Sequence, residues 1–123
     1  MKAASLHTDR FSFELSALEL RMILAGLREA DQELEDWEFQ ARTGFERNSM
    51  RALHEAIFKK EKWRQVYSYN LEFSAEEVRM ILAGLREADR TLEGWELQTR
   101  TTFERSSLRA FHDDILAALN RAG

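Results

Sequence analysis

The stretch RMILAGLREAD occupies residues 21–31 and occurs again, letter for letter, at residues 79–89. Laying Arg79 on Arg21 aligns the two copies, and the match extends well beyond these eleven letters. Between segments 13–58 and 71–116, 30 of the 46 aligned positions are identical. Such self-similarity indicates a duplicated structural unit, which constrains the architecture before any single residue is considered.

Each copy opens on alternating apolar residues. They are Phe11, Phe13 and Leu15 in the first copy, and Tyr67, Tyr69, Leu71 and Phe73 in the second. Apolar residues at every second position are typical of a short strand with one buried face. We expect the two equivalent segments to pair as a short two-stranded β-ribbon. Helices must pack on such a ribbon, because two strands alone are marginally stable.

A long helix is predicted after each strand. Ser16 and Ser74 each precede a glutamate three residues later, which is the capping box that opens a helix. Apolar residues then recur at helical spacing in the first copy, at Leu20, Ile23, Leu24, Leu27, Ala30, Leu34 and Trp37. The pattern predicts a helix over 17–42 and its copy over 75–100. Gly26 and Gly84 lie inside these helices and indicate a close approach to a neighbouring helix.

A second helix follows a turn in each copy. The turns are RTGFERNS at 42–49 and RTTFERSS at 100–107. Gly44 suits a helix C-cap, and Ser49 and Ser107 suit the N-caps of the helices that follow. Because the connection is short, the two helices of each copy should be antiparallel neighbours and form a helical hairpin.

These patterns predict a mainly α fold built by tandem duplication of a strand–helix–helix unit. Repeat 1 spans 11–58, a linker spans 59–70, and repeat 2 spans 71–119, all within one compact domain over 1–123. We expect the two antiparallel hairpins to form a pseudo-two-fold four-helix bundle that resembles a fused homodimer, because isologous dimers are the commonest assembly. An open stack of hairpins is the competing geometry.

Composition restricts the function. The chain has a net charge of −4, so bulk electrostatics do not draw it to nucleic acid or to an anionic membrane. It has no cysteine, which excludes disulfides, thiol catalysis and cysteine-based zinc sites. No apolar run is long enough for a signal peptide or a membrane span. We therefore expect a cytoplasmic protein, monomeric or homodimeric, with no membrane association.

Catalytic motifs are also missing from the sequence. It contains no P-loop, no nucleophile elbow and no HExxH motif. We expect a protein that is not an enzyme and that needs no cofactor.

Glutamate and histidine are expected to meet within each hairpin. An antiparallel arrangement places Glu38 level with His54, and Glu96 level with His112. Imidazole and carboxylate groups suit zinc, iron or manganese, so these four residues are weak candidates for metal ligands. We favour a structural interpretation, a partly buried histidine held by a carboxylate, because the Glu-x-x-His pairing of helical di-iron bundles is absent. Asp31 and Asp89 are likewise polar residues on predicted apolar faces.

Arginines gather around the FERxSxRAxH turn of both copies, at Arg42, Arg47, Arg51, Arg100, Arg105 and Arg109. Arginines beside a helix N-terminus are suited to bind an anion or the acidic surface of a partner. The alternative is ordinary surface pairing with Glu46, Glu55, Glu104 and Asp113. The segment KKEKWRQVYSY at 59–69, which includes Trp63, combines basic and aromatic residues as nucleic-acid-binding segments do. The net negative charge of the chain opposes nucleic-acid binding.

We expect a non-enzymatic protein–protein interaction or regulatory module that uses exposed helix faces or the arginine turns. The alternative is a binding protein for a phosphate-bearing ligand, a nucleotide or nucleic acid, through the repeated arginine-rich turns. The third hypothesis is a metal-binding helical bundle. Functional differences between the copies are expected where they disagree, at 32–36 against 90–94 and in the linker.

Overall fold

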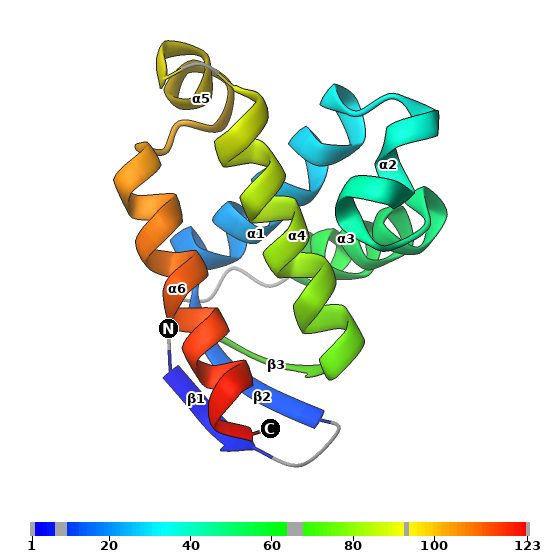
Figure 1. Ribbon diagram of the computed structural model, residues 1–123. Helices are drawn as coiled ribbons and strands as arrows, with labels where there is room; N and C mark the ends of the chain where they lie inside the picture. The colour runs from blue at the N-terminus through cyan, green and yellow to red at the C-terminus, as the bar shows by residue number, and fades with distance from the viewer. Residues whose placement is uncertain (1, 7–9, 64–67, 93, 123) are drawn as a thin grey trace.

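The computed structural model describes the backbone of residues 2–6, 10–63, 68–92 and 94–122 (Figure 1). Side chains are described for 10–60, 68–92, 97–99 and 101–121. This part of the chain forms three strands and six helices: β1 (Lys2–Leu6), β2 (Arg10–Ser16), α1 (Ala17–Glu33), α2 (Asp36–Thr43), α3 (Arg47–Trp63), β3 (Ser68–Ser74), α4 (Ala75–Thr91), α5 (Gly94–Thr101) and α6 (Arg105–Ala122). Within it, no helix is both long and apolar enough to cross a membrane.

The strands form one antiparallel sheet in the order β1–β2–β3. The predicted pairing of the two equivalent strands is confirmed, since Arg10 faces Ser74, Phe13 faces Leu71 and Ser16 faces Ser68. Burial alternates along both β2 and β3, as the apolar pattern predicts, and Tyr67 lies outside the described residues. Strand β1 was not predicted, because its sequence KAASL lacks the alternation of large apolar residues.

Both predicted capping boxes are confirmed at the starts of α1 and α4. The Glu19 amide donates to Ser16 Oγ over 3.0 Å, and the Ser16 amide donates to Glu19 Oε1 over 2.9 Å. Ser74 and Glu77 make the same two bonds at the start of α4, over 3.0 and 2.8 Å. The helices therefore begin where the sequence places them.

Helices α1 and α4 are the central pair of the fold, with α3 packed on α1 and α6 packed on α4 (Figure 1). The predicted close approach occurs at the two helical glycines. A Cβ atom added to Gly26 would lie 3.0 Å from the Leu85 amide nitrogen, and one added to Gly84 would lie 3.0 Å from the Leu27 amide nitrogen. Few real Cβ atoms come this close to another atom, so a side chain at either position would require the two helices to move apart by a few tenths of an ångström, and glycine sets their separation.

The predicted long helices over 17–42 and 75–100 are wrong, because each is broken into two. In the first copy the helix ends at Leu34, which has extended backbone angles (φ −95°, ψ 133°), and Glu35 caps a new helix, α2. In the second copy Leu92 is extended in the same way (φ −103°, ψ 135°). The break turns Trp37 away from the core, where the uninterrupted helix would have placed it, and leaves it 80% exposed.

Of the two helix caps predicted at the turn before α3, only the C-cap is confirmed. Gly44 is the left-handed C-cap of α2 (φ 83°), as expected. Helix α3 begins at Arg47 and α6 begins at Arg105, so Ser49 and Ser107 are helical residues and the predicted N-caps are wrong. The amide of Ser49 already donates to the Glu46 carbonyl over 3.1 Å.

Thr102 occupies the same left-handed position in the second copy, with φ 68°. A β-branched residue is strained there, whereas glycine is not. We expect Thr102→Gly to stabilise the protein by about 1 kcal/mol. Urea unfolding checks the value, with Gly44→Thr as the matched control that should cost a similar amount. A destabilising Thr102→Gly would show that side-chain contacts of the threonine outweigh the strain.

Candidate functional site

The arginine of the first turn binds the end of the preceding helix. Arg47 Nη1 contacts Asp31 Oδ1 at 2.9 Å and also donates to the Asp31 carbonyl, and Nη2 donates to the Leu34 carbonyl over 2.6 Å. Its guanidinium also stacks over the Phe39 ring, 4.5 Å from the ring centre. A cation at the C-terminus of a helix is favourable because the terminal carbonyls lack partners. Arg47 therefore holds α1 and α2 at the point where the helix breaks.

The second turn repeats this arrangement. Arg105 Nε lies 3.0 Å from Asp89 Oδ1, and Arg105 Nη2 donates to the Leu92 carbonyl. Arg51 and Arg109 add a second guanidinium to each aspartate, with Nε–Oδ distances of 2.9 and 3.0 Å. Asp31 and Asp89, the polar residues on predicted apolar faces, are thus the anchors of these arginines. Among the described side chains, Arg51 and Arg109 thus pair across helices in place of the expected surface pairing with Glu55 and Asp113.

A buried carboxylate holds Arg42. Glu87 of α4 is fully buried, and its Oε2 lies 2.8 Å from Arg42 Nη2 of α2. Arg86 Nη2 donates to the Arg42 carbonyl over 2.7 Å, so α2 is fastened to α4 twice. Glu29, the counterpart of Glu87 in the first copy, is 1% exposed and contacts Arg28 Nη2 at 3.2 Å. The side chain of Arg100, like that of Trp63, lies outside the described residues.

Sequence reasoning missed both buried glutamates. Glu29 follows Met22 and Gly26 at spacings of seven and three residues, so all three lie along one side of α1. That side is buried. The available signal was the near-continuous apolar character of the helix, which indicates burial on two sides. The prediction followed only the side that includes Leu20, Leu24 and Leu27.

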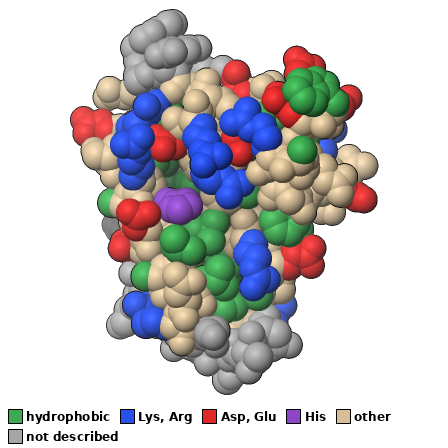
Figure 2. Space-filling view, in the orientation of Figure 1, with side chains coloured by type: hydrophobic (Ala, Val, Ile, Leu, Met, Phe, Trp, Pro, Cys, Tyr) green, Lys and Arg blue, Asp and Glu red, His purple; other side chains and the backbone are tan. Residues whose placement is uncertain are grey.

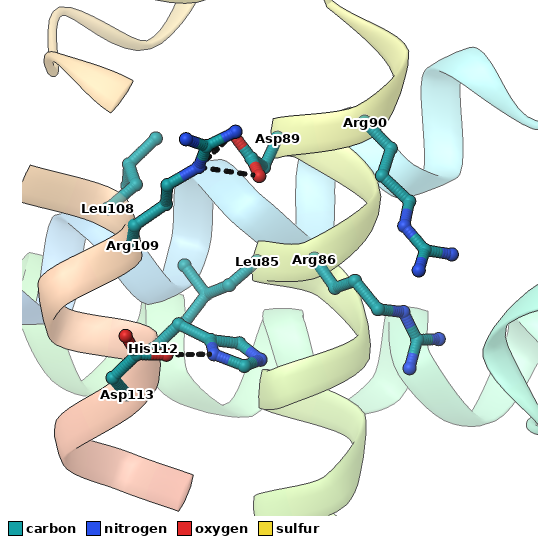
Figure 3. Close-up of a pocket in the computed structure, with 8 residues that line it drawn as sticks. All are labelled: Leu85, Arg86, Asp89, Arg90, Leu108, Arg109, His112 and Asp113. Atoms are coloured by element: carbon teal, nitrogen blue, oxygen red, sulfur yellow. Dashed lines mark hydrogen bonds and ion pairs between the residues drawn. The ribbon is translucent and has the colours of Figure 1, made fainter. Parts of the chain in front are cut away.

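Two equivalent grooves lie beside these ion pairs. The groove between α4 and α6 has a volume of about 310 Å³ and is lined by Leu85, Arg86, Asp89, Arg90, Leu108, Arg109, His112 and Asp113 (Figure 3). Six of these residues have counterparts in the first copy that line a groove of about 190 Å³ between α1 and α3. Figure 3 shows Asp89 and Arg109 paired on one side of α4, with Arg86 and Arg90 extended on the other.

The face in Figure 2 is electrostatically mixed. Lys and Arg side chains gather over α4 and α6, with acidic side chains between them. Arg90 is exposed and, within the described part of the chain, has no hydrogen-bond or ion-pair partner. Its counterpart in the first copy is Gln32, so the larger groove has one more positive charge than a strict repeat would give it.

The predicted contact between Glu38 and His54 is replaced by other contacts of each side chain. Glu38 Oε1 accepts from the Glu35 amide over 2.9 Å, and its Oε2 lies 3.7 Å from Arg42. His54 instead stacks on Phe58 with ring centres 6.2 Å apart. His112 Nδ1 lies 3.2 Å from Asp113 Oδ1, and the Glu96 side chain lies outside the described residues.

Metal ligands are not clustered in this arrangement. Among the described side chains, no group of three or more His, Asp or Glu residues is arranged to hold a metal ion. Glu38, His54 and His112 therefore belong to no such group among the described side chains, and Glu96 lies outside them.

The surroundings of His54 favour its neutral form. Burial lowers the pKa of His54 below its ordinary value of 6.5, the Arg28 charge lowers it further, and Asp31 opposes the shift. The unfolded chain therefore binds this proton at a higher pH than the folded chain does. The stability tied to neutral His54 is complete above about pH 6.5 and is lost as the pH falls from there through the folded-state pKa.

We expect His54→Gln to reduce the acid-induced loss of unfolding free energy in this window. Urea unfolding at a series of pH values from about 7.5 to 5 measures the difference between the two proteins. His112→Gln is the matched control, since it leaves His54 in place. Identical pH profiles for His54→Gln and the unmodified chain would contradict the assignment.

A further cavity lies between α1, α3 and the connection from α5 to α6, and its volume of about 410 Å³ exceeds that of either groove. A separate exposed feature is Trp37 on α2. In Figure 2, acidic side chains surround an exposed hydrophobic side chain at the edge of the molecule over α2.

No protein-family model, curated protein or solved structure matches this chain. Its function is therefore inferred from these structural features alone.

Proposed function

We propose that this chain is a non-enzymatic protein–protein interaction module whose binding surface is centred on Trp37. The single observation that carries the proposal is the 80% exposure of this side chain. Tryptophan is among the residue types most enriched at interface hot spots, because it buries a large apolar area on binding. Trp37 is exposed to solvent on α2, a short helix that two contacts attach to α4. Its side chain therefore contributes little to the core and is accessible to a pocket on a partner protein.

The surroundings of Trp37 favour a basic partner. Asp36 is 99% exposed and Glu35 is also exposed, so acidic groups flank the tryptophan. Oppositely charged surfaces accelerate encounter and fix orientation. The segment aligned with 32–36 in the second copy contains Arg90, Thr91 and Gly94 in place of Gln32, Glu33 and Asp36. The acidic character therefore belongs mainly to the first copy, and we expect the partner to bind there.

Affinity capture from an extract of the source cells tests the proposal. The unmodified chain, Trp37→Ala and Leu18→Ala are compared as baits. Leu18 is 55% exposed on a different helix and serves as the matched control. A partner retained by the first and third baits and lost from Trp37→Ala supports the surface. Equal capture by all three baits would exclude Trp37 as the centre of the interface.

The alternative, a phosphate-bearing ligand bound through the arginine turns, has less support. Arg47 and Arg51 are already paired with Asp31, and Arg105 and Arg109 with Asp89. An incoming anion would have to displace a carboxylate from each turn. Trp37→Ala separates the two functions, because the protein-interaction proposal places the contact on Trp37, whereas the double substitution of Arg47 and Arg105 would also loosen the helix break that Arg47 holds.

We further infer that the four long helices form a pseudo-two-fold bundle that derives from a homodimer of hairpins. Two observations support this inference. Phe13 pairs with Leu71, its own counterpart in the second copy, and Gly26 and Gly84 make reciprocal close contacts. Deleting 65–123 is expected to give a fragment that dimerises in sedimentation experiments. A fragment that is monomeric and fully folded would contradict the inference.

A further inference from the structure

We propose that the cavity between α1, α3 and the α5–α6 connection binds a small amphipathic carboxylate, with an apolar body and one negative charge. This site is separate from the Trp37 surface, and its test does not depend on that surface. The cavity volume of about 410 Å³ falls within the range of about 300–1,000 Å³ that small-molecule sites occupy.

The wall of the cavity is apolar. Leu24 and Ala25 of α1, Phe58 of α3 and Phe103 of the α5–α6 connection contribute to it. Phe58 remains 44% exposed, so part of its ring is open to a ligand in the cavity. Its ring is nearly parallel to that of His54, with an interplanar angle of 10°. An aromatic or branched apolar group would cover this surface and displace water from it.

The charges of the cavity are of one sign. Arg21 and Arg28 of α1 contribute to its lining, and none of the described residues that line it is acidic. This distinguishes it from the two grooves beside the turns, whose lining includes Asp31 or Asp89. Arg28 also contacts Glu29, but that carboxylate is buried and not part of the lining. A ligand carboxylate would therefore be attracted by the arginines of the lining without repulsion from a described acidic side chain there.

His54 adds to the selectivity for an apolar group. Burial and the Arg28 charge lower its pKa, so the ring is neutral near pH 7 and offers a flat surface of low charge. The positive charge at the site then comes from the arginines. This arrangement separates an apolar region at His54 and Phe58 from a basic one, which fits a ligand that is apolar along its body and charged at its end.

The cavity joins the two copies of the repeat. Helices α1 and α3 come from the first copy, whereas Thr101, Thr102 and Phe103 come from the second. In the aligned copies, Phe58 corresponds to Leu116 and Arg21 corresponds to Arg79. Leu116 and Arg79 therefore provide matched control positions on the second copy.

The test is an NMR titration of the full-length protein with 4-phenylbutyrate and, separately, with its neutral amide, 4-phenylbutyramide. The carboxylate is expected to give saturable amide shifts at Ala25, Thr102 and Phe103, with a dissociation constant on the order of 1 mM or tighter. The neutral amide should bind about tenfold more weakly, because it lacks the charge that Arg21 and Arg28 attract. This comparison uses the unmodified chain, so it does not depend on any variant folding.

The variants locate the site. Phe58→Ser should weaken the binding of 4-phenylbutyrate by about tenfold and Arg21→Gln by about threefold, whereas Leu116→Ser and Arg79→Gln should leave it unchanged. All four positions are exposed, so the variants are expected to fold. Absent shifts at the cavity, equal binding of the acid and the amide, or equal effects of Phe58→Ser and Leu116→Ser would each overturn the proposal.

Discussion

Alanine at Gly84 is expected to lower the free energy of unfolding by about 2 kcal/mol, although alanine ordinarily favours a helix over glycine by about 1 kcal/mol. The added Cβ would lie 3.0 Å from the Leu27 amide nitrogen and 3.1 Å from the Gly26 carbonyl carbon. Both are backbone atoms of a neighbouring helix, which no side-chain rotation can move. Helices α1 and α4 must therefore separate, and the contacts along the central pair of the fold weaken.

Urea unfolding measures this loss, and Gly26→Ala should reproduce it, because its Cβ would meet Leu85 and Gly84 at 3.0–3.2 Å. Gln32→Ala is the control, since Gln32 is an exposed residue of the same helix and should change stability by less than about 0.5 kcal/mol. A stabilised Gly84→Ala would mean that helix propensity outweighs the close approach, and that glycine does not set the helix separation.

Removing Arg42 is the second change with a large expected effect. Arg42→Ala leaves the fully buried Glu87 without the guanidinium that lies 2.8 Å from its Oε2. Loss of one partner from a buried ion pair costs up to about 3 kcal/mol, because Glu87 keeps only the more distant Arg86, whose Nε lies 3.7 Å from Glu87 Oε1. The same substitution removes one of the two contacts that fasten α2 to α4, while the bond from Arg86 to the residue-42 carbonyl remains, so the change should be visible as reduced protection of α2 amides in hydrogen exchange.

A double-mutant cycle separates the ion pair from general packing. Adding Glu87→Gln to Arg42→Ala should restore much of the lost stability, because the double variant no longer buries a carboxylate. Arg90→Ala is the matched single control, since Arg90 is an exposed arginine of α4, the helix that also contains Glu87. If the effects of Arg42→Ala and Glu87→Gln simply add, the pair is not coupled and the burial of Glu87 has another compensation.

The repeat predicted the secondary structure well where a local signal existed. The capping boxes at Ser16 and Ser74 and the alternation along β2 and β3 each depend on residues a few positions apart, and each is confirmed. The close approach of the helices was also readable, because a glycine inside a helix is costly unless a neighbour requires it. These are the features in which propensity and tertiary packing agree.

The break after Leu34 had no comparable signal. The sequence LEDWE contains neither glycine nor proline, and Glu35 is a weaker capping residue than serine or aspartate. The helix ends there because Arg47, thirteen residues later, donates to the Leu34 carbonyl. An interaction across that separation exists only after folding, so the periodicity of Leu27, Leu34 and Trp37 was extended one turn too far. Trp37 was assigned to the core for the same reason.

The partners of the arginines in the turns also could not be predicted from neighbouring residues in the sequence. Arg51 and Arg109 reach aspartates twenty residues earlier in the chain, on a different helix. Spacing rules within one helix consider only residues three or four apart, and they pointed to Glu55 and Asp113 instead. The polar positions Asp31 and Asp89 were identified as unusual, but only the packing of α3 on α1 and of α6 on α4 gives them partners.

The central pairing of α1 with α4 also bears on synthesis of the chain. Helix α1 begins at Ala17 and α4 begins at Ala75, so the ribosome completes the first helix well ahead of the one that covers it. At about 5–20 residues per second, the interval is about 3–12 s. For that time the face with Gly26 has no cover from its own chain. We expect the nascent first half to be the stage at which chaperones bind and at which aggregation begins.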